Sequence, residues 1–96
     1  MVVSEAITSF EIYLLSERRL AKNTVASYLG DLKQFESYAR KKKVEYLKDI
    51  DTNFLRSYLK HLRNRLHAGP RSMSRKVSTL KSWFKFISLK YCVGLS

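Results

Sequence analysis

The sequence predicts an all-α fold, a single domain built from four helices. Apolar residues recur every three or four positions along most of the 96 residues, whereas the alternation of apolar and polar residues typical of a half-buried strand is absent. Hydrophobic residues make up 45% of the chain, which is sufficient for one core in a domain of this length. We therefore expect residues 1–96 to form one domain, with helices at about 4–18, 22–42, 51–67 and 72–90.

The first predicted helix, residues 4–18, is defined by its apolar spacing and by a serine at its start. Ser4 is the candidate N-cap, because its hydroxyl can accept a hydrogen bond from a backbone amide of the first turn. Phe10 and Leu14 lie one turn apart on the same face. The first seventeen residues contain glutamates and no Lys or Arg, so we do not expect this helix to be the main surface toward an anionic partner.

The second predicted helix, residues 22–42, carries the longest apolar repeat, which runs from Val25 to Phe35 and beyond. Gly30 inside it costs up to ~1 kcal/mol relative to alanine, and we interpret it as a site of close helix packing. The helix ends in a run of four basic residues, 40–43, which we interpret as a solvated helix end favoured by the helix dipole.

The segment between the second and third helices is predicted to insert Leu47 and Ile50 into the core. Asp51 then caps the third helix, residues 51–67, with Ile50 before it as part of a hydrophobic staple. Tyr58 lies on the buried face of that helix and is interpreted as a packing group. The Gly-Pro pair that follows is the clearest stop signal in the chain.

The fourth predicted helix, residues 72–90, has the most regular pattern. Ser72 is its candidate N-cap. The residues expected to face the core are Met73, Val77, Leu80, Phe84 and Ile87. The opposite face is then expected to display Arg75, Ser78, Thr79 and Ser82. Trp83 can belong either to the core or to an exposed patch.

Charge identifies the class of partner. After Asp51 the chain contains ten Lys and Arg and no acidic residue, and its net charge is +11. Such a segment needs a polyanion, of which nucleic acid is the commonest. The guanidinium group of arginine can form two parallel hydrogen bonds with a guanine edge or a phosphate, and small hydroxyl residues beside it let the DNA approach closely. The alternative is that Arg71 and Arg75 merely solubilise an amphipathic helix.

Two polar helix starts flanked by basic residues favour contact with DNA. The residues predicted to bind it are Lys22, Asn23, Thr24, Ser27, Arg71, Ser72, Arg75, Lys76 and Thr79.

Other kinds of site have little support in the sequence. Cys92 is the single cysteine, so no intrachain disulfide is possible and a reducing compartment is indicated. His61 and His67 are six residues apart and share no helix face, and carboxylates are few and scattered. We therefore expect no metal site, no catalytic residues and no cofactor.

We also expect no small-molecule substrate. No stretch approaches the roughly 18–20 apolar residues of a membrane span, and the N-terminus lacks the features of a secretory signal. The sequence thus predicts a cytoplasmic protein without a membrane partner.

Several motifs follow one another in a specific order along the chain: Phe10-x-x-Tyr13-Leu14, Leu20-Ala21-Lys22-Asn23-Thr24, Tyr28-x-x-Asp31-Leu32-x-x-Phe35, and the segment from Ser72 to Phe86. Together they resemble the N-terminal core-binding domain of tyrosine site-specific recombinases, the bacterial Xer type and phage integrases most closely. The short N-terminus favours the Xer type. The resemblance covers the chain from about Ser4 to Tyr91.

The resemblance implies a bundle of SAM-like topology that forms one half of a clamp around double-stranded DNA. In the family the second and fourth helices approach the major groove, which matches the surface reached from periodicity. Thr24 and Ser72 occupy positions where such domains direct hydroxyls toward the DNA backbone. The first helix would pack against other recombinase protomers in a tetramer on DNA.

The sequence also departs from the family pattern. Ala21 stands where the family often has serine, so the second helix lacks its usual cap, and Gly69-Pro70 replaces a more helix-compatible start of the fourth. Family catalysis uses an Arg/Lys/His/Arg cluster and a tyrosine nucleophile in a following domain, and none of these is present. We therefore expect a domain of a longer recombinase, which binds duplex DNA without cutting it. The parent would serve chromosome-dimer resolution or element integration.

Two other classes of protein remain as alternatives. A SAM-type helical protein-interaction module would use its charge for solubility or for an acidic partner, and would show little affinity for duplex DNA. A small helix-turn-helix regulator would bind a palindrome as a dimer, although no dimerisation segment is evident.

Overall fold

The computed structural model describes residues 2–65, 67 and 69–91. These residues form four α-helices and one short 3-10 turn: α1 (Val3–Ser16), α2 (Lys22–Lys41), η1 (Leu47–Asp49), α3 (Thr52–Asn64) and α4 (Pro70–Tyr91). Within the described ranges, extended pairing is limited to an isolated bridge between Val2 and Tyr46. The predicted all-α four-helix fold is confirmed.

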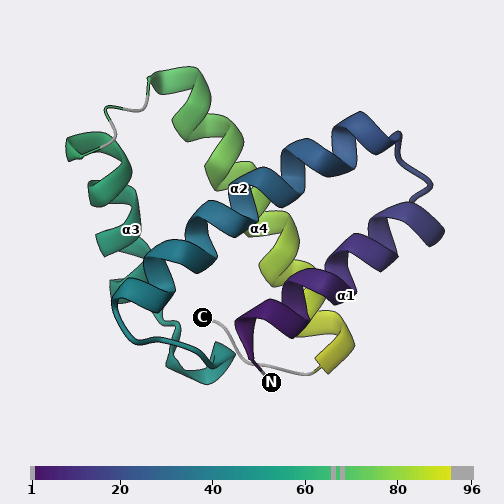
Figure 1. Cartoon of the computed structure of the whole chain (residues 1–96), viewed down its shortest axis with the longest axis horizontal. Helices are drawn as coiled ribbons and strands as arrows, with labels where there is room; N and C mark the ends of the chain where they lie inside the picture. Colours follow the sequence, from purple (N-terminus) through teal and green to yellow (C-terminus); the bar gives the residue numbers. More distant parts are fainter. Residues whose placement is uncertain (1, 66, 68, 92–96) are drawn as a thin grey trace.

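The helices are arranged around α2. As Figure 1 shows, α1 and α2 form a hairpin, α4 crosses α2, and α3 lies at the end of α2 that is distant from the hairpin turn. Helix α4 packs against each of the other three helices. Because α2 and α4 cross near the middle of the molecule, residues 31 and 75–79 meet although they are far apart in the sequence.

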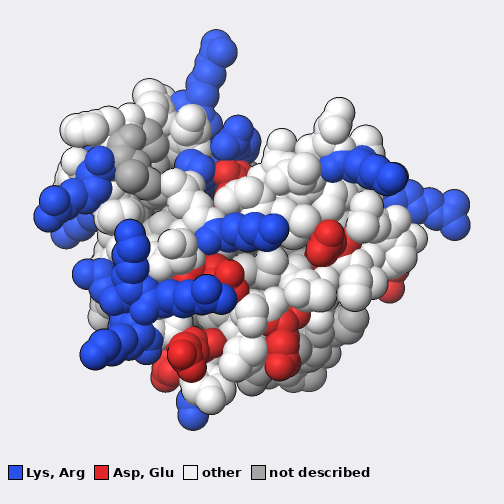
Figure 2. Space-filling model, in the orientation of Figure 1, with Lys and Arg blue, Asp and Glu red and all other residues white. Residues whose placement is uncertain are grey.

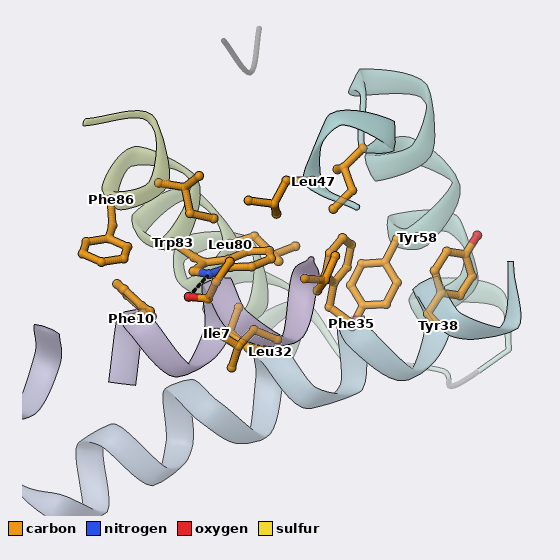
Figure 3. Packing of buried hydrophobic residues seen from close by; sticks show 14 of the residues in the cluster. Ile7, Phe10, Leu32, Phe35, Tyr38, Leu47, Tyr58, Leu80, Trp83 and Phe86 are labelled. Atoms are coloured by element: carbon orange, nitrogen blue, oxygen red, sulfur yellow. Dashed lines mark hydrogen bonds between the residues drawn. The ribbon is translucent and has the colours of Figure 1, made fainter. Parts of the chain in front are cut away.

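The core is rich in aromatic side chains (Figure 3). Phe35 on α2 lies edge-on to Tyr58 of α3 and to Trp83 of α4, with ring centroids 5.0 and 5.8 Å apart. Trp83 is fully buried, and its Nε1–H donates a hydrogen bond to the carbonyl of Ala6 on α1, 3.3 Å away. Such edge-to-face contacts add to the stabilisation from burial alone. Of the two places open to it from the sequence, Trp83 therefore lies in the core, where it links α4 to α1 and α2.

Two of the three predicted helix caps are wrong. Ser4 is not a cap, because α1 begins at Val3 and the Val3 amide donates to the Glu45 carbonyl at 2.8 Å, so a distant backbone group replaces a local side chain. Ser72 lies inside α4, which begins at Pro70. The fixed φ of proline suits the first helical position, so the helix begins at Pro70. The Gly69 carbonyl accepts the first helical hydrogen bond, from the Met73 amide.

The third predicted cap is confirmed. Asp51 accepts a hydrogen bond from the Phe54 amide at 2.8 Å and so begins α3. That helix ends at Asn64, three residues before the predicted end. The connector also behaves as expected, since Leu47 and Ile50 are 1% and 2% exposed, and Tyr58 is buried.

The end of α2 explains the basic run at residues 40–43. All four side chains are exposed, as expected for a solvated helix end. Lys43 has a φ of 61°, its amide donates to Arg40, and the Val44 amide donates to Ala39. This is a Schellman arrangement, in which a residue in the left-handed region closes the helix, here with lysine in the position usually taken by glycine.

The inner face of α4 is rotated from the predicted one. Leu80 and Ile87 are buried as expected, but the other three predicted core residues, Met73, Val77 and Phe84, are only half-buried. The buried face also includes Trp83, Phe86 and Thr79. Thr79 is 2% exposed, so the prediction that it is displayed on the outer face is wrong; its hydroxyl has a partner on α2.

Gly30 does not have the packing role predicted for it. The residue is exposed, and a Cβ built at this position would meet no atom within 4 Å. We expect Gly30→Ala to raise the free energy of unfolding by about 0.5–1 kcal/mol, because alanine restricts the unfolded chain and adds no clash. Urea denaturation followed by circular dichroism measures the change.

Ala26→Gly is the matched control for this prediction, because Ala26 is exposed on the same helix. It should lower the stability by a similar amount. A loss of stability in Gly30→Ala would mean that the glycine has a partner or a conformation that the structure does not contain.

Candidate nucleic-acid interface

A buried carboxylate joins α2 to α4. Asp31 is 5% exposed, and it accepts hydrogen bonds from Arg75 at both oxygens: Nε to Oδ2 at 3.2 Å and Nη2 to Oδ1 at 3.0 Å. Lys76 Nζ donates to Oδ1 at 3.0 Å, and the Thr79 hydroxyl donates to Oδ2 at 3.2 Å. We call Asp31, Arg75, Lys76 and Thr79 the Asp31 cluster. Lys76 Nζ also donates to Gln34 Oε1 at 2.6 Å.

The charges within the cluster favour an ionised Asp31. Burial opposes ionisation, but the hydrogen bonds and positive charges of Lys76 and Arg75 outweigh it, so the pKa of Asp31 lies below its ordinary value. The two cations differ in exposure. The Lys76 side chain is 12% exposed, whereas the Arg75 side chain is 59% exposed. Lys76 is therefore a largely shielded partner of the carboxylate, and Arg75 reaches from the carboxylate to the surface.

An open groove lies beside the cluster, between the first half of α2 and α4. Its lining combines hydroxyl residues with three members of the Asp31 cluster: Thr24, Ser27, Tyr28, Asp31, Arg75, Ser78 and Thr79. Tyr28 also lines a neighbouring hollow that includes Arg18, Ser82 and Lys85. Both hollows present hydroxyl groups and exposed cations along one side of the molecule, which is a chemistry suited to a sugar–phosphate backbone.

The start of α2 adds backbone donors to this side. Ala21 is the N-cap residue of α2 and provides no side-chain cap, as its alanine side chain requires. The expected absence of the usual cap is thus confirmed. The amides of the first turn therefore remain available to an anion beside Thr24, where the positive end of the helix dipole also favours negative charge.

The predicted site residues are brought together only in part. Thr24 and Ser27 are exposed and share the groove with Arg75 and the buried Thr79. The remaining predicted residues are not among those that line it: Lys22, Asn23, Arg71, Ser72 and Lys76. Of these, Lys22, Asn23 and Arg71 are exposed on the first turns of α2 and α4, Ser72 is half-buried, and Lys76 turns inward.

Sequence reasoning assigned no role to Asp31, which is the centre of the arrangement. The residue occurs in a family motif, but its own signal is its position. It lies between Tyr28 and Phe35 on the apolar face of α2, where an acidic side chain requires a buried partner. Tyr28 was also missed as a groove residue, whereas Ser78 is exposed as expected and lines the groove although it was not among the residues predicted to bind DNA.

The surface charge is distributed unevenly (Figure 2). In that view, Lys and Arg side chains gather most densely at the left, and others project at the top and the right, whereas Asp and Glu are scattered singly over the face. The described residues contain no group of three or more His, Cys, Asp or Glu placed to hold a metal ion. His61 instead packs against the ring of Tyr38, and Cys92 lies outside the described residues.

None of the described helices combines the length and the apolar character that crossing a membrane would require.

Comparison with known proteins identifies the family. Residues 7–90 match the model of the phage integrase N-terminal SAM-like domain. The chain is 42% identical to tyrosine recombinase XerD of Rickettsia bellii over 84 residues. The aligned segment covers 86% of this chain and 27% of that protein. A tyrosine recombinase of Pseudothermotoga lettingae is 34% identical over 86% of this chain and 29% of its own length.

XerC of Roseiflexus sp. is 30% identical over 90% of this chain and 27% of its own length. The chain thus spans about a quarter of the length of these relatives. No solved structure gave a significant match. The resemblance seen in the sequence is confirmed by the family match, and the chain belongs to the phage integrase N-terminal SAM-like domain family.

Proposed function

We propose that this chain is the duplex-DNA-binding module of a tyrosine site-specific recombinase, and that it forms one half of a clamp around the recombination site. The observation that carries the proposal is the groove between α2 and α4, in which the exposed Arg75 lies beside Thr24 and Ser27. Family membership and the net charge of +11 support it.

In this proposal the two helix starts approach the major groove together. Lys22, Asn23 and Thr24 meet the backbone at the start of α2, with the uncapped amides of that turn. Arg71 and Ser72 do the same at the start of α4. Arg75 faces the DNA from the protein groove that it lines, while Lys76 and Thr79 act indirectly by holding Asp31.

Strand cleavage and rejoining are proposed for the rest of the parent protein, so this chain alone should bind DNA and leave it intact. We propose that protomers of the parent assemble as a tetramer on DNA and meet through α1. Ile12 and Leu15 on α1 are 59% and 43% exposed, which fits a helix that is covered in an assembly.

The proposal predicts steep salt dependence. Fluorescence anisotropy with a labelled duplex should show affinity falling about 100-fold when salt rises from about 50 to 200 mM, if roughly four phosphates are neutralised. A SAM-type protein-interaction module would show little duplex affinity at either salt concentration. It would instead self-associate or bind peptides.

A pair of double variants tests the location of the interface. Arg71→Gln with Arg75→Gln removes two charges at the proposed interface, and Lys60→Gln with Arg63→Gln removes two exposed charges on α3. The first pair should weaken binding more and flatten the salt dependence more than the second. Equal effects would mean that binding follows net charge alone, contrary to a defined interface at α2 and α4.

A further inference from the structure

We propose that Asp31 is a positioning residue that fixes the guanidinium of Arg75 so that its outward edge reads a guanine in the duplex. The inference rests on the proposed function and extends it from DNA binding to base recognition. It is based on the hydrogen bonds within the Asp31 cluster and on the different exposure of its members.

The donors of Arg75 divide into two sets. A guanidinium carries five N–H groups, one on Nε and two on each terminal nitrogen. Asp31 takes Nε–H and one N–H of Nη2, which together form one edge of the group. The edge between Nη1 and Nη2 keeps its donors, and such a fork matches O6 and N7 of guanine in the major groove.

Exposure distinguishes the two edges. Asp31 is 5% exposed, so the edge that it binds faces the protein, whereas the Arg75 side chain as a whole is 59% exposed. Arg75 also lines the open groove beside the small hydroxyl residues Thr24 and Ser78, which leave room for a base edge to approach. The free fork is therefore the part of Arg75 that a bound duplex would meet.

The carboxylate that holds Arg75 is itself held. Lys76 bonds one oxygen of Asp31 and Thr79 bonds the other, so the plane of the carboxylate is fixed, and Gln34 in turn holds Lys76. A bidentate pair built on a fixed carboxylate sets the plane of the guanidinium before DNA arrives. Pre-organisation of this kind reduces the side-chain ordering that binding would otherwise require.

The charge of the cluster favours a base over a phosphate as the partner. One carboxylate lies 3.0 Å from the nitrogens of two cations, so the cluster carries a net charge of one across both. A phosphate contact depends on local positive charge, which Asp31 reduces, whereas a base contact depends on orientation, which Asp31 supplies.

The experiment is selection of preferred sequences from a pool of random duplexes, performed with the wild-type chain and with Arg75→Ala, Asp31→Asn and the pair Asp31→Asn/Lys76→Met. We expect Arg75→Ala to lose the preference for guanine at one position, with a fall in discrimination of roughly 5- to 150-fold. Asp31→Asn should lose the preference at the same position, and should have no further effect in the Arg75→Ala background.

The paired variant separates loss of recognition from loss of the folded state. It removes one charge of each sign, so the net charge is unchanged and no buried ammonium is left without its carboxylate. It should bind duplex DNA and still lack the guanine preference. Lys76→Met alone is the matched control, since it removes one support of the carboxylate but leaves the bonds from Arg75 and Thr79 to Asp31 in place. It should weaken the preference less than the paired variant does.

Replacement of that guanine by 7-deazaguanine, which lacks the N7 acceptor, should reproduce the loss in the wild-type chain and change little in Asp31→Asn. Three results would overturn the inference: a uniform loss of affinity in Arg75→Ala, an unchanged preference in the paired variant, or indifference of the wild type to 7-deazaguanine. Failure of the wild-type chain to bind any duplex would instead overturn the proposed function, and this inference with it.

Discussion

Trp83→Ala is expected to lower the free energy of unfolding by about 3–5 kcal/mol, the range found when a buried aromatic side chain is truncated. Trp83 is fully buried, bonds the Ala6 carbonyl, and packs against Phe35. A domain of this size has a total stability of about 5–15 kcal/mol, so the variant should lose a large part of it and unfold at a clearly lower temperature and urea concentration. Trp83 is the only tryptophan of the chain, so circular dichroism, and not fluorescence, should monitor urea denaturation.

Two controls separate cavity formation from general sensitivity of α4. Trp83→Phe keeps an aromatic ring and loses the indole donor, so it should cost less than Trp83→Ala. Leu89→Ala changes a residue that is 76% exposed on the same helix, and should alter the stability by no more than about 0.5 kcal/mol. Similar losses in Trp83→Ala and Leu89→Ala would contradict the central place of Trp83 in the core.

Asp31→Ala is expected to lower the free energy of unfolding by about 2–4 kcal/mol near neutral pH. The main cause is Lys76, whose side chain is 12% exposed and would keep a charge without its carboxylate. Arg75 contributes less because water screens an exposed cation. Thermal denaturation of the wild type and the variant measures the difference.

The same pair of proteins should show a pH dependence. The pKa of Asp31 is lowered in the folded state, so its contribution is present above the pKa of the unfolded chain, about 3.9, and is lost as pH falls through the lower folded value. The gap in stability between wild type and Asp31→Ala should therefore be constant from neutral pH to about pH 5 and narrow below about pH 4. A gap that stays constant in acid would show that the ionised carboxylate is not what stabilises the cluster.

Local signals predicted much of this fold. The start of α2 at Lys22, the cap at Asp51 and the burial of Leu47 and Ile50 all follow from features within a few residues of each position. These features depend on backbone amides and apolar spacing, which the sequence displays directly. The family resemblance added the topology, which no single segment contains.

The errors concern interactions between distant residues. Ser4 and Ser72 fit the local pattern for caps, but Glu45 supplies an acceptor for α1, and Pro70 begins α4. Gly30 was interpreted through a packing partner that the structure does not provide. In each case the sequence shows what a residue can do locally, while the fold determines which groups are already satisfied.

The candidate site was predicted only in outline, because it too depends on contacts between residues that are distant in the sequence. Helical periodicity located the helix starts and Arg75, but it placed Thr79 outside, because the rule treats every polar side chain as solvent-facing. A carboxylate on another helix, 48 residues away, makes an inward threonine and lysine favourable. Only the crossing of α2 and α4 brings these groups together.

The position of Asp31 on α2 has a consequence for how target preference could change in evolution or by engineering. Asp31 lies one helical turn from Phe35, the residue about which the core rings are arranged. Substitutions at Asp31 would therefore destabilise the fold whatever their effect on recognition of DNA. Asn23, Thr24 and Ser27 lie on the same helix, are exposed and are absent from the core. Libraries aimed at new target sequences should diversify these three positions and leave Asp31 unchanged.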